Sequence, residues 1–166
     1  SQENEKQIVG KECKDYNLIA IEINQENVFK VDSAVCEAAL WAVVNLACDE
    51  NVATILGSVG GIGAVIDLAE KCQENENIAL PSVSAIRNLS SAGTLNYSLL
   101  AHTRVCEVLL FMLNKYGKDV EIAETGLWAI TNLACDSVLG ERLGLLGTGK
   151  VITDLYFSIV PLHPSE

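Results

Sequence analysis

The sequence predicts an all-α protein, a solenoid of about three similar helical repeats in which the repeats at both ends are incomplete. The first observation is an internal repeat, because residues 37–49 have the sequence EAALWAVVNLACD and residues 124–136 have ETGLWAITNLACD. A diverged copy, VSAIRNLS, lies at 83–90, so that Asn45, Asn88 and Asn132 stand 43 and then 44 residues apart. The second observation is the helical spacing of the apolar residues inside each copy. A period of this size is typical of stacked helical units.

Each repeat is expected to contain a short helix, a longer helix and a third helix that carries the asparagine. The third helices should face the core, because Ala39, Val43 and Leu46 lie on one face of the first copy and Leu127, Ile130 and Leu133 on the equivalent face of the last. The apolar runs that predict the helices are, in chain order, 18–23 and 33–48; 55–56, 65–69 and 83–90; 99–100, 108–113 and 124–136; and 151–156. Polar connectors at 73–77 and 115–119 separate the repeats.

These residues resemble the armadillo-repeat family, and the segments WAVVNLA at 41–47 and WAITNLA at 128–134 are similar to the Trp-x-x-x-Asn helices of importin α. The resemblance covers about residues 16 to 160. It implies a right-handed solenoid of three-helix repeats whose third helices line a concave groove with a ladder of asparagines. The implied single domain, 1–166, divides into a partial first repeat at about 16–49, repeats at 50–92 and 93–136, a partial last repeat at 137–160, and a tail at 161–166.

Neither end of the expected solenoid has the polar character of a capping repeat, and the last repeat lacks a third helix because residues 150–160 lead directly into prolines. A solenoid repeat buries its apolar face against its neighbours. We therefore expect either a segment of a longer array or self-association through an open end.

The charge balance favours basic partners, since 22 acidic residues against 11 basic ones give a formal net charge of −11. The same imbalance argues against unaided binding to nucleic acid. No apolar stretch is long enough for a membrane span, and the first residues lack the apolar centre of a secretory signal. The six cysteines show no metal-binding spacing, and most are expected to be buried thiols in a reducing compartment. We expect a soluble protein of the cytoplasm, the nucleus or both.

Two ribbons of side chains at intervals of four residues are the candidate binding surface, because such residues are neighbours on a helix. An asparagine can bond an extended peptide backbone, an indole can take an aliphatic stem or a cation, and carboxylates attract Lys and Arg. The ribbons are Glu37, Trp41, Asn45 and Asp49, and Glu124, Trp128, Asn132 and Asp136. The alternative is that Trp and Asn are structural, with the amide bonded to neighbouring backbone.

The middle repeat departs from this pattern, because Ser84 replaces the indole four residues before Asn88 and Arg87 stands beside that asparagine. Loss of the indole removes one side-chain pocket. Arg87 would repel a basic ligand or attract an acidic one if it faces the groove. Alternatively, it points to solvent or pairs with a neighbouring acid.

Nucleotide binding and catalysis are not expected. The segment Gly144 to Lys150 has the spacing of a phosphate-binding loop, but Val151 replaces the required hydroxyl residue and no strand precedes it. His102 and His163 are the only histidines and form no motif. We expect a non-enzymatic protein without metal or cofactor.

The sequence therefore favours a module that holds an extended, basic segment of another protein along a groove. The alternative is a structural or regulatory scaffold segment that binds a folded partner, such as a small GTPase, an adhesion protein or a cytoskeletal protein.

Overall fold

The computed structural model describes residues 32–159, and the expected helix at 18–23 lies outside them. These described residues form nine α-helices and one short 3-10 helix, η1, and they contain no strand, so the all-α prediction is confirmed. The elements are α2 (Ser33–Leu46), α3 (Glu50–Ser58), α4 (Gly61–Lys71), η1 (Glu76–Ile78), α5 (Ala79–Ser91), α6 (Thr94–Leu100), α7 (Val105–Tyr116), α8 (Val120–Leu133), α9 (Ser137–Leu145) and α10 (Thr148–Ile159).

Aspartates begin four of these helices. Asp32, Asp49, Asp119 and Asp136 each accept backbone N–H bonds at the N-terminus of the helix that follows. A side-chain acceptor at this position satisfies backbone donors that have no partner within the helix. The helices therefore start where short polar side chains interrupt the apolar sequence.

Glycines form the corners between two pairs of short and longer helices. Gly60, between α3 and α4, has φ of 84°, and Gly147, between α9 and α10, has φ of 80°. A residue with a β-carbon is strained in this left-handed conformation, which explains why glycine occupies both corners.

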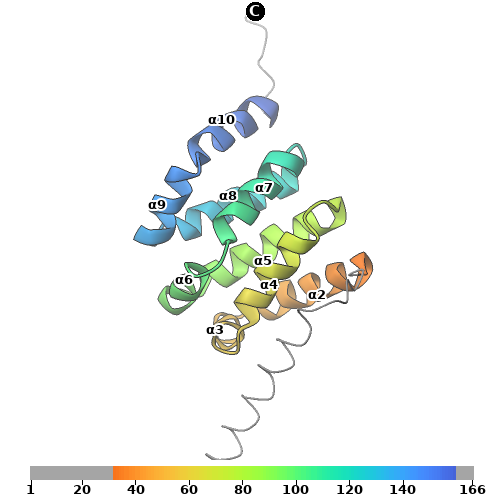
Figure 1. Cartoon of the computed structure of the whole chain (residues 1–166), viewed down its shortest axis with the longest axis vertical. Coiled ribbons are helices and arrows are strands. Elements are labelled where there is room, and N and C mark those ends of the chain that lie inside the picture. Colours follow the sequence, from red (N-terminus) through yellow and green to blue (C-terminus); the bar gives the residue numbers. More distant parts are fainter. Residues whose placement is uncertain (1–31, 160–166) are drawn as a thin grey trace, which may run out of the picture. The chain divides into compact units, whose positions relative to one another are not determined.

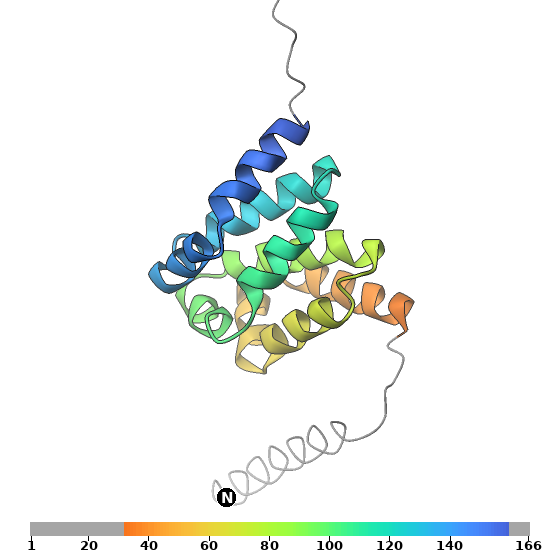
Figure 2. The ribbon, with the colours of Figure 1, turned by 45° about the horizontal axis from the view of Figure 1, so that its top comes forward.

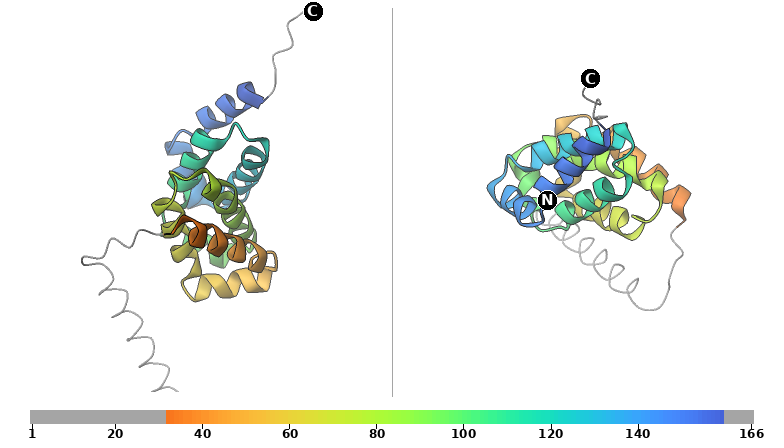
Figure 3. Two further views of the ribbon diagram at one scale, coloured as in Figure 1. Left: turned by 90° about the vertical axis from the view of Figure 1, so that its right-hand side faces the viewer. Right: turned by 90° about the horizontal axis from the view of Figure 1, so that it is seen from above.

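The asparagine-bearing helices α2, α5 and α8 lie side by side, with α5 between the other two (Figure 1). Helix α4 contacts α5 and α6, whereas α7 contacts both α5 and α8. Helix α10 packs against α7, α8 and α9. Within residues 32–159, α2 and α3 lie toward one end and α9 and α10 toward the other (Figures 2 and 3).

The buried apolar side chains form one continuous core. Its largest fully buried members include Leu40 on α2, Ile86 on α5, Leu109 on α7 and Leu133 on α8. These residues come from every part of the described chain, so each helix depends on its neighbours for burial of its apolar face.

The predicted core face is mostly correct for α8, where Leu127 is only half-buried, and partly wrong for α2. Ile130 and Leu133 are buried, as expected, whereas Ala39 is exposed and Leu46 is 51% exposed. The helices that α2 contacts, α4, η1 and α5, all follow it in the sequence. The side of α2 that carries Ala39 and Leu46 therefore has no such neighbour among the described residues.

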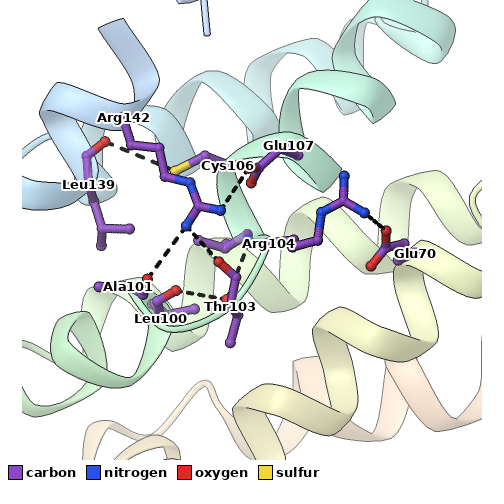
Figure 4. Close-up of polar contacts among 10 residues, drawn as sticks. Glu70, Leu100, Ala101, Thr103, Arg104, Cys106, Glu107, Leu139 and Arg142 are labelled. Atoms are coloured by element: carbon purple, nitrogen blue, oxygen red, sulfur yellow. Dashed lines mark hydrogen bonds and ion pairs between the residues drawn. The ribbon is translucent and has the colours of Figure 1, made fainter. Parts of the chain in front are cut away.

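Arg142 on α9 joins this helix to the turn between α6 and α7 and to Glu107 on α7 (Figure 4). Its guanidinium donates to the backbone oxygen of Thr103 at 2.7 Å and to Glu107 Oε1 at 2.7 Å. Nearby, Arg104 pairs with Glu70 on α4. Both contacts join segments 34 or more residues apart and help to hold successive helical layers in place.

The expectation of mostly buried cysteines is only partly correct. Cys36 and Cys106 are buried and Cys72 is half-buried, whereas Cys48 and Cys135 are exposed, because they follow the last turns of α2 and α8. Burial and the adjacent thiol of Cys36, 3.1 Å away, raise the pKa of Cys72 to about 11. Burial also raises the pKa of Cys106 to about 11. Cys13 lies outside the described residues.

Between residues 32 and 159, no single helix is long and apolar enough to cross a membrane. Helices α3 and α4 meet the length and composition criteria only as a pair, and they are bent by 84° relative to each other.

Candidate functional site

The two tryptophans occupy equivalent exposed positions on α2 and α8. Trp41 is 37% exposed and Trp128 is 51% exposed, which is unusual for the largest apolar side chain. On α5, the equivalent position holds Ser84, which is half-buried. The face formed by α2, α5 and α8 thus has an indole at each side and a small hydroxyl in the middle.

The asparagines form a regular set of bridges between these helices. Asn88 on α5 donates through Nδ2 to the backbone oxygen of Val44 on α2 at 3.0 Å. Asn132 on α8 donates through Nδ2 to the backbone oxygen of Arg87 on α5 at 3.1 Å. In both cases the acceptor is the residue just before the asparagine of the preceding helix.

The bridges use the donor side of each amide. No donor among residues 32–159 reaches Oδ1 of Asn88 or Asn132, and Asn45 makes no side-chain hydrogen bond within the same range. Because each amide oxygen can accept a hydrogen bond, the three helices keep acceptor capacity along this face.

The four ribbon carboxylates fall into two kinds. Asp49 and Asp136 are the N-caps of α3 and α9, where each Oδ1 accepts two backbone N–H bonds of 2.9 to 3.1 Å. Glu37 is half-buried and Glu124 is exposed. None of the four takes part in the ion pairs of the described residues, so their negative charges are not neutralised by those partners.

Arg87 is exposed and makes no ion pair within residues 32–159. Its backbone oxygen accepts the bond from Asn132, which places the residue along the junction of α5 and α8. The guanidinium of Arg87 therefore does not pair with any acid among the described residues.

An open hollow of about 220 Å³ lies beside Trp128 and is lined by Glu124, Leu127, Trp128 and Thr131. Sequence reasoning missed Thr131 altogether and assigned Leu127 to the core, whereas Leu127 is only half-buried. The spacing could have identified both residues, because Leu127 and Thr131 are four residues apart and flank Trp128 on the same helix.

A second hollow, of about 140 Å³, lies between α7 and α10 and contains no predicted site residue. Its lining includes Asn114, Lys118, Asp154 and Ser158. This mixed polar lining belongs to the packing of two adjacent helices.

The phosphate-loop-like segment is a helical corner. Residues 144–150 run from the end of α9 through Gly147 into α10, and Lys150 pairs with Asp154 one turn later. His102 contacts the backbone oxygen of Ser98, and His163 lies outside the described residues. Within the described part of the chain, no cluster of His, Cys, Asp or Glu is suited to hold a metal ion.

Tyr97 on α6 lies near the end of the Trp128 ribbon. Burial raises the pKa of its phenol, and the proximity of Cys135 and Asp136 raises this pKa further. The phenol therefore stays neutral at neutral pH and adds no charge beside Asp136.

Helices α2 and α8 thus each carry an exposed tryptophan, and asparagine bridges join α5 to α2 and α8 to α5. The four candidate acids lie on or directly after α2 and α8 and form no ion pair within residues 32–159. This arrangement offers indoles, amide oxygens and carboxylates that could contact an extended chain. Comparisons of the chain with models of protein families, with characterised proteins and with solved structures found no match.

Proposed function

We propose that this chain is a non-enzymatic protein-binding module of armadillo type, a right-handed α-solenoid of about three repeats with incomplete ends. In this proposal α2, α5 and α8 are the third helices of successive repeats. Their exposed face holds an extended, basic segment of another protein. The compartment proposed for this interaction is the cytoplasm, the nucleus or both.

The observation that carries the proposal is the repeated bridge from Asn88 to Val44 and from Asn132 to Arg87. Both bridges use the amide nitrogens, and no donor among residues 32–159 reaches the amide oxygens. We therefore propose that Asn45, Asn88 and Asn132 accept hydrogen bonds from the backbone N–H groups of a bound peptide. Backbone recognition of this kind holds an extended chain regardless of its sequence.

Specificity would come from the side chains beside the asparagines. The hollow at Trp128 suits an aliphatic stem, whose cationic end could lie over the indole or near Glu124. Neighbouring helices pack about 10 Å apart, so Trp41 and Trp128 would lie on the order of 20 Å from each other. An extended peptide of about six residues covers this distance.

Charge would select the ligand at both sides of the face. Glu37 and Asp49 lie on or beside α2, and Glu124 and Asp136 on or beside α8. Arg87, on the middle helix, disfavours a cation at the centre of the peptide. The preferred ligand thus has basic residues near both tryptophans and a neutral or acidic residue between them.

The test is a titration of the full chain with extended Lys- and Arg-rich peptides at two salt concentrations, with acidic and neutral peptides as controls. Trp41 and Trp128 are the only indoles, so tryptophan fluorescence reports directly on the proposed face. Saturable binding of basic peptides that weakens as salt rises would support the proposal, because salt screens exposed charges. The absence of any response from the folded chain would overturn it.

Replacement of one indole tests the pocket. Trp128→Ala is expected to weaken a basic peptide by about 1 to 3 kcal/mol, because the indole supplies most of the apolar contact at the hollow. Binding is measured by the anisotropy of a labelled peptide. The matched control is Phe157→Ala, since Phe157 is an aromatic residue of similar exposure, 57%, on α10. Equal affinities of the folded variants would rule out the pocket.

The second candidate function is a scaffold segment that binds a folded partner, such as a small GTPase, an adhesion protein or a cytoskeletal protein. The same asparagine bridges favour it, because they give Asn88 and Asn132 a structural role. A packed interface should lose less affinity with salt than a charge-selected peptide complex.

A further inference from the structure

The junctions between successive asparagine-bearing helices follow one pattern. Asn88 bridges α5 to Val44 on α2, and Asn132 bridges α8 to Arg87 on α5. Each junction thus joins a donor on the later helix to a backbone acceptor on the earlier helix. At each end of this series of helices, one half of such a junction has no partner among residues 32–159.

On α2, the half without a described partner is the amide donor of Asn45. This donor lies within an apolar surface. We define the leading face of α2 as Val35, Ala42, Asn45 and Leu46. Val35 is 65% exposed and Leu46 is 51% exposed, and Ala42 is also exposed. The equivalent residues are buried in the later copies: Ile78, Ala85 and Leu89, and Ile122, Ala129 and Leu133. The leading face therefore has the composition of a helix junction but lacks a described neighbour.

On α8, the corresponding half is the backbone oxygen of Thr131, which accepts from the thiol of Cys135 but from no amide among the described residues. The equivalent oxygen of Val44 accepts from both the Cys48 thiol and Asn88. We define the trailing face of α8 as Val120, Leu127 and Thr131. Leu127 is half-buried, whereas the equivalent Leu40 on α2 and Val83 on α5 are fully buried by the next helix. The backbone oxygen of Thr131 is equivalent to those of Val44 and Arg87, which accept the two bridges. The hollow beside Thr131 shows that this face is open.

We infer that the leading face of α2 in one copy packs on the trailing face of α8 in a second copy. In this arrangement Asn45 Nδ2 donates to the backbone oxygen of Thr131, which repeats the internal register. The inference concerns the ends of the helix series and does not depend on the proposed peptide binding.

The second copy is the occupant that the sequence of α2 favours. Residues 37–49 and 124–136 are identical at nine of thirteen positions. Helix α8 already uses its own leading face to pack on the trailing face of α5, so a nearly identical helix is suited to a similar surface. The contact joins two different surfaces, and repetition of such a contact produces open chains of copies rather than closed dimers.

Charge gives this association a distinctive salt dependence. Each copy carries a formal charge of −11, so that copies repel each other at low salt. Screening removes part of this repulsion, and self-association is therefore expected to strengthen as salt rises. Binding of a basic peptide is expected to change in the opposite direction, so failure of one proposal can be told apart from failure of the other.

A cysteine placed at position 45 tests the register directly. Within the chain, Asn88 Nδ2 lies 3.6 Å from Cys48 Sγ, and Cys135 is the equivalent of Cys48 on the α8 side. Residue 45 of one copy should therefore lie beside Cys135 of the next. Asn45→Cys in the full chain, oxidised with glutathione disulfide, should form 45–135 links and a ladder of dimers, trimers and higher species on a non-reducing gel.

Two controls make the cross-link specific. The double variant Asn45→Cys with Cys135→Ser should lose the ladder. The matched single variant Asn51→Cys places a thiol at another exposed asparagine, on α3, and should not react with Cys135 above background. Mass spectrometry of the digested products identifies the linked residues. Equal 51–135 and 45–135 linking, or no 45–135 link, would overturn the inference.

Sedimentation equilibrium of the unmodified chain provides an independent measurement. The average mass should rise with concentration beyond that of a dimer. Val120→Lys should weaken association at least fivefold. Val138→Lys, which adds the same charge at a valine of nearly equal exposure near the start of α9, should leave it unchanged. A strict monomer, a mass that stops at the dimer, or equal effects of the two variants would contradict the head-to-tail contact.

Discussion

Asn132 shows how one residue type has different consequences at equivalent positions. Its amide bridges α8 to the backbone of Arg87, whereas Asn45 has no such partner among the described residues. The three asparagines are therefore interchangeable in the repeat pattern but not in their contribution to stability.

Asn132→Ala is expected to lower the free energy of unfolding by about 1 kcal/mol, because it removes one hydrogen bond between helices. Urea denaturation of the dilute chain measures the change. Asn45→Ala is the matched control and should change stability by less than about 0.5 kcal/mol. Equal losses in both variants would mean that the bridge contributes nothing to stability.

The buried thiol of Cys106 is expected to make the folded chain less stable in alkaline solution. Burial raises the pKa of its thiol from 9.0 to about 11, so the folded chain holds this proton where the unfolded chain releases it. The contribution of the protonated thiol to the free energy of unfolding is fully present below about pH 9 and is lost as the pH rises toward 11. Urea unfolding from pH 8 to 11 should show a decline in the free energy of unfolding. This decline should be shallower in Cys106→Ala than in the unmodified chain. Identical slopes would show that another group causes the decline.

At the scale of a helix, Asp136 combines two functions that can be separated. It caps α9 by accepting bonds from Val138 and Leu139, and it also carries a charge beside the proposed peptide face. An asparagine at this position can accept the same bonds but lacks the charge.

Asp136→Ala is therefore expected to destabilise the chain by about 1 kcal/mol, whereas Asp136→Asn should remain close to the wild type. Both variants should bind a basic peptide more weakly, because both lose the carboxylate. Thermal denaturation and peptide titration measure the two effects. Full peptide affinity in Asp136→Asn would exclude charge selection at this residue.

Gly126 on α8 packs directly against Leu113 on α7. A β-carbon at this position would overlap Leu113 Cδ2, so a shift of the leucine or of a helix would be required. Gly126→Ala should destabilise the chain by about 1 to 3 kcal/mol through overpacking.

The control for this prediction is Gly63→Ala on α4, where no atom lies within 4 Å of the added β-carbon. This variant should gain about 0.5 to 1 kcal/mol, because alanine favours the helix over glycine. Chemical denaturation should thus give opposite signs for the two variants. A gain in both would show that Leu113 repacks without strain.

At the scale of the whole described molecule, helices that are nearly identical in sequence meet different surroundings. Helix α5 has α2 on one side and α8 on the other, whereas α2 and α8 each have one such neighbour. The exposed leading face of α2 and the half-exposed Leu127 on α8 both result from this difference. Peptide binding and self-association are two proposals that overlap at the hollow beside Trp128, and their opposite responses to salt should distinguish them.

Much of the local structure could be predicted from the sequence. The predicted runs at 55–56, 65–69 and 83–90 lie within α3, α4 and α5, and those at 99–100, 108–113 and 151–156 lie within α6, α7 and α10. The run at 124–136 extends three residues beyond the end of α8. This success has a local cause, since helical spacing and the capping aspartates act within a few residues. The same local reasoning places the members of each ribbon beside one another, because residues four apart are neighbours on a helix.

The sequence by itself determined the all-α class, the repeated helix pattern and the placement of each Trp and Asn on one face. Only the tertiary structure decided the acceptors of Asn88 and Asn132, the exposure of Leu46 and the hollow beside Leu127. Periodicity shows which side of a helix is apolar, but the neighbouring helix decides whether that side is covered. In a series of similar helices, burial of the apolar side depends on where each helix stands in the series. The nearly identical sequences of the helices do not reveal that position.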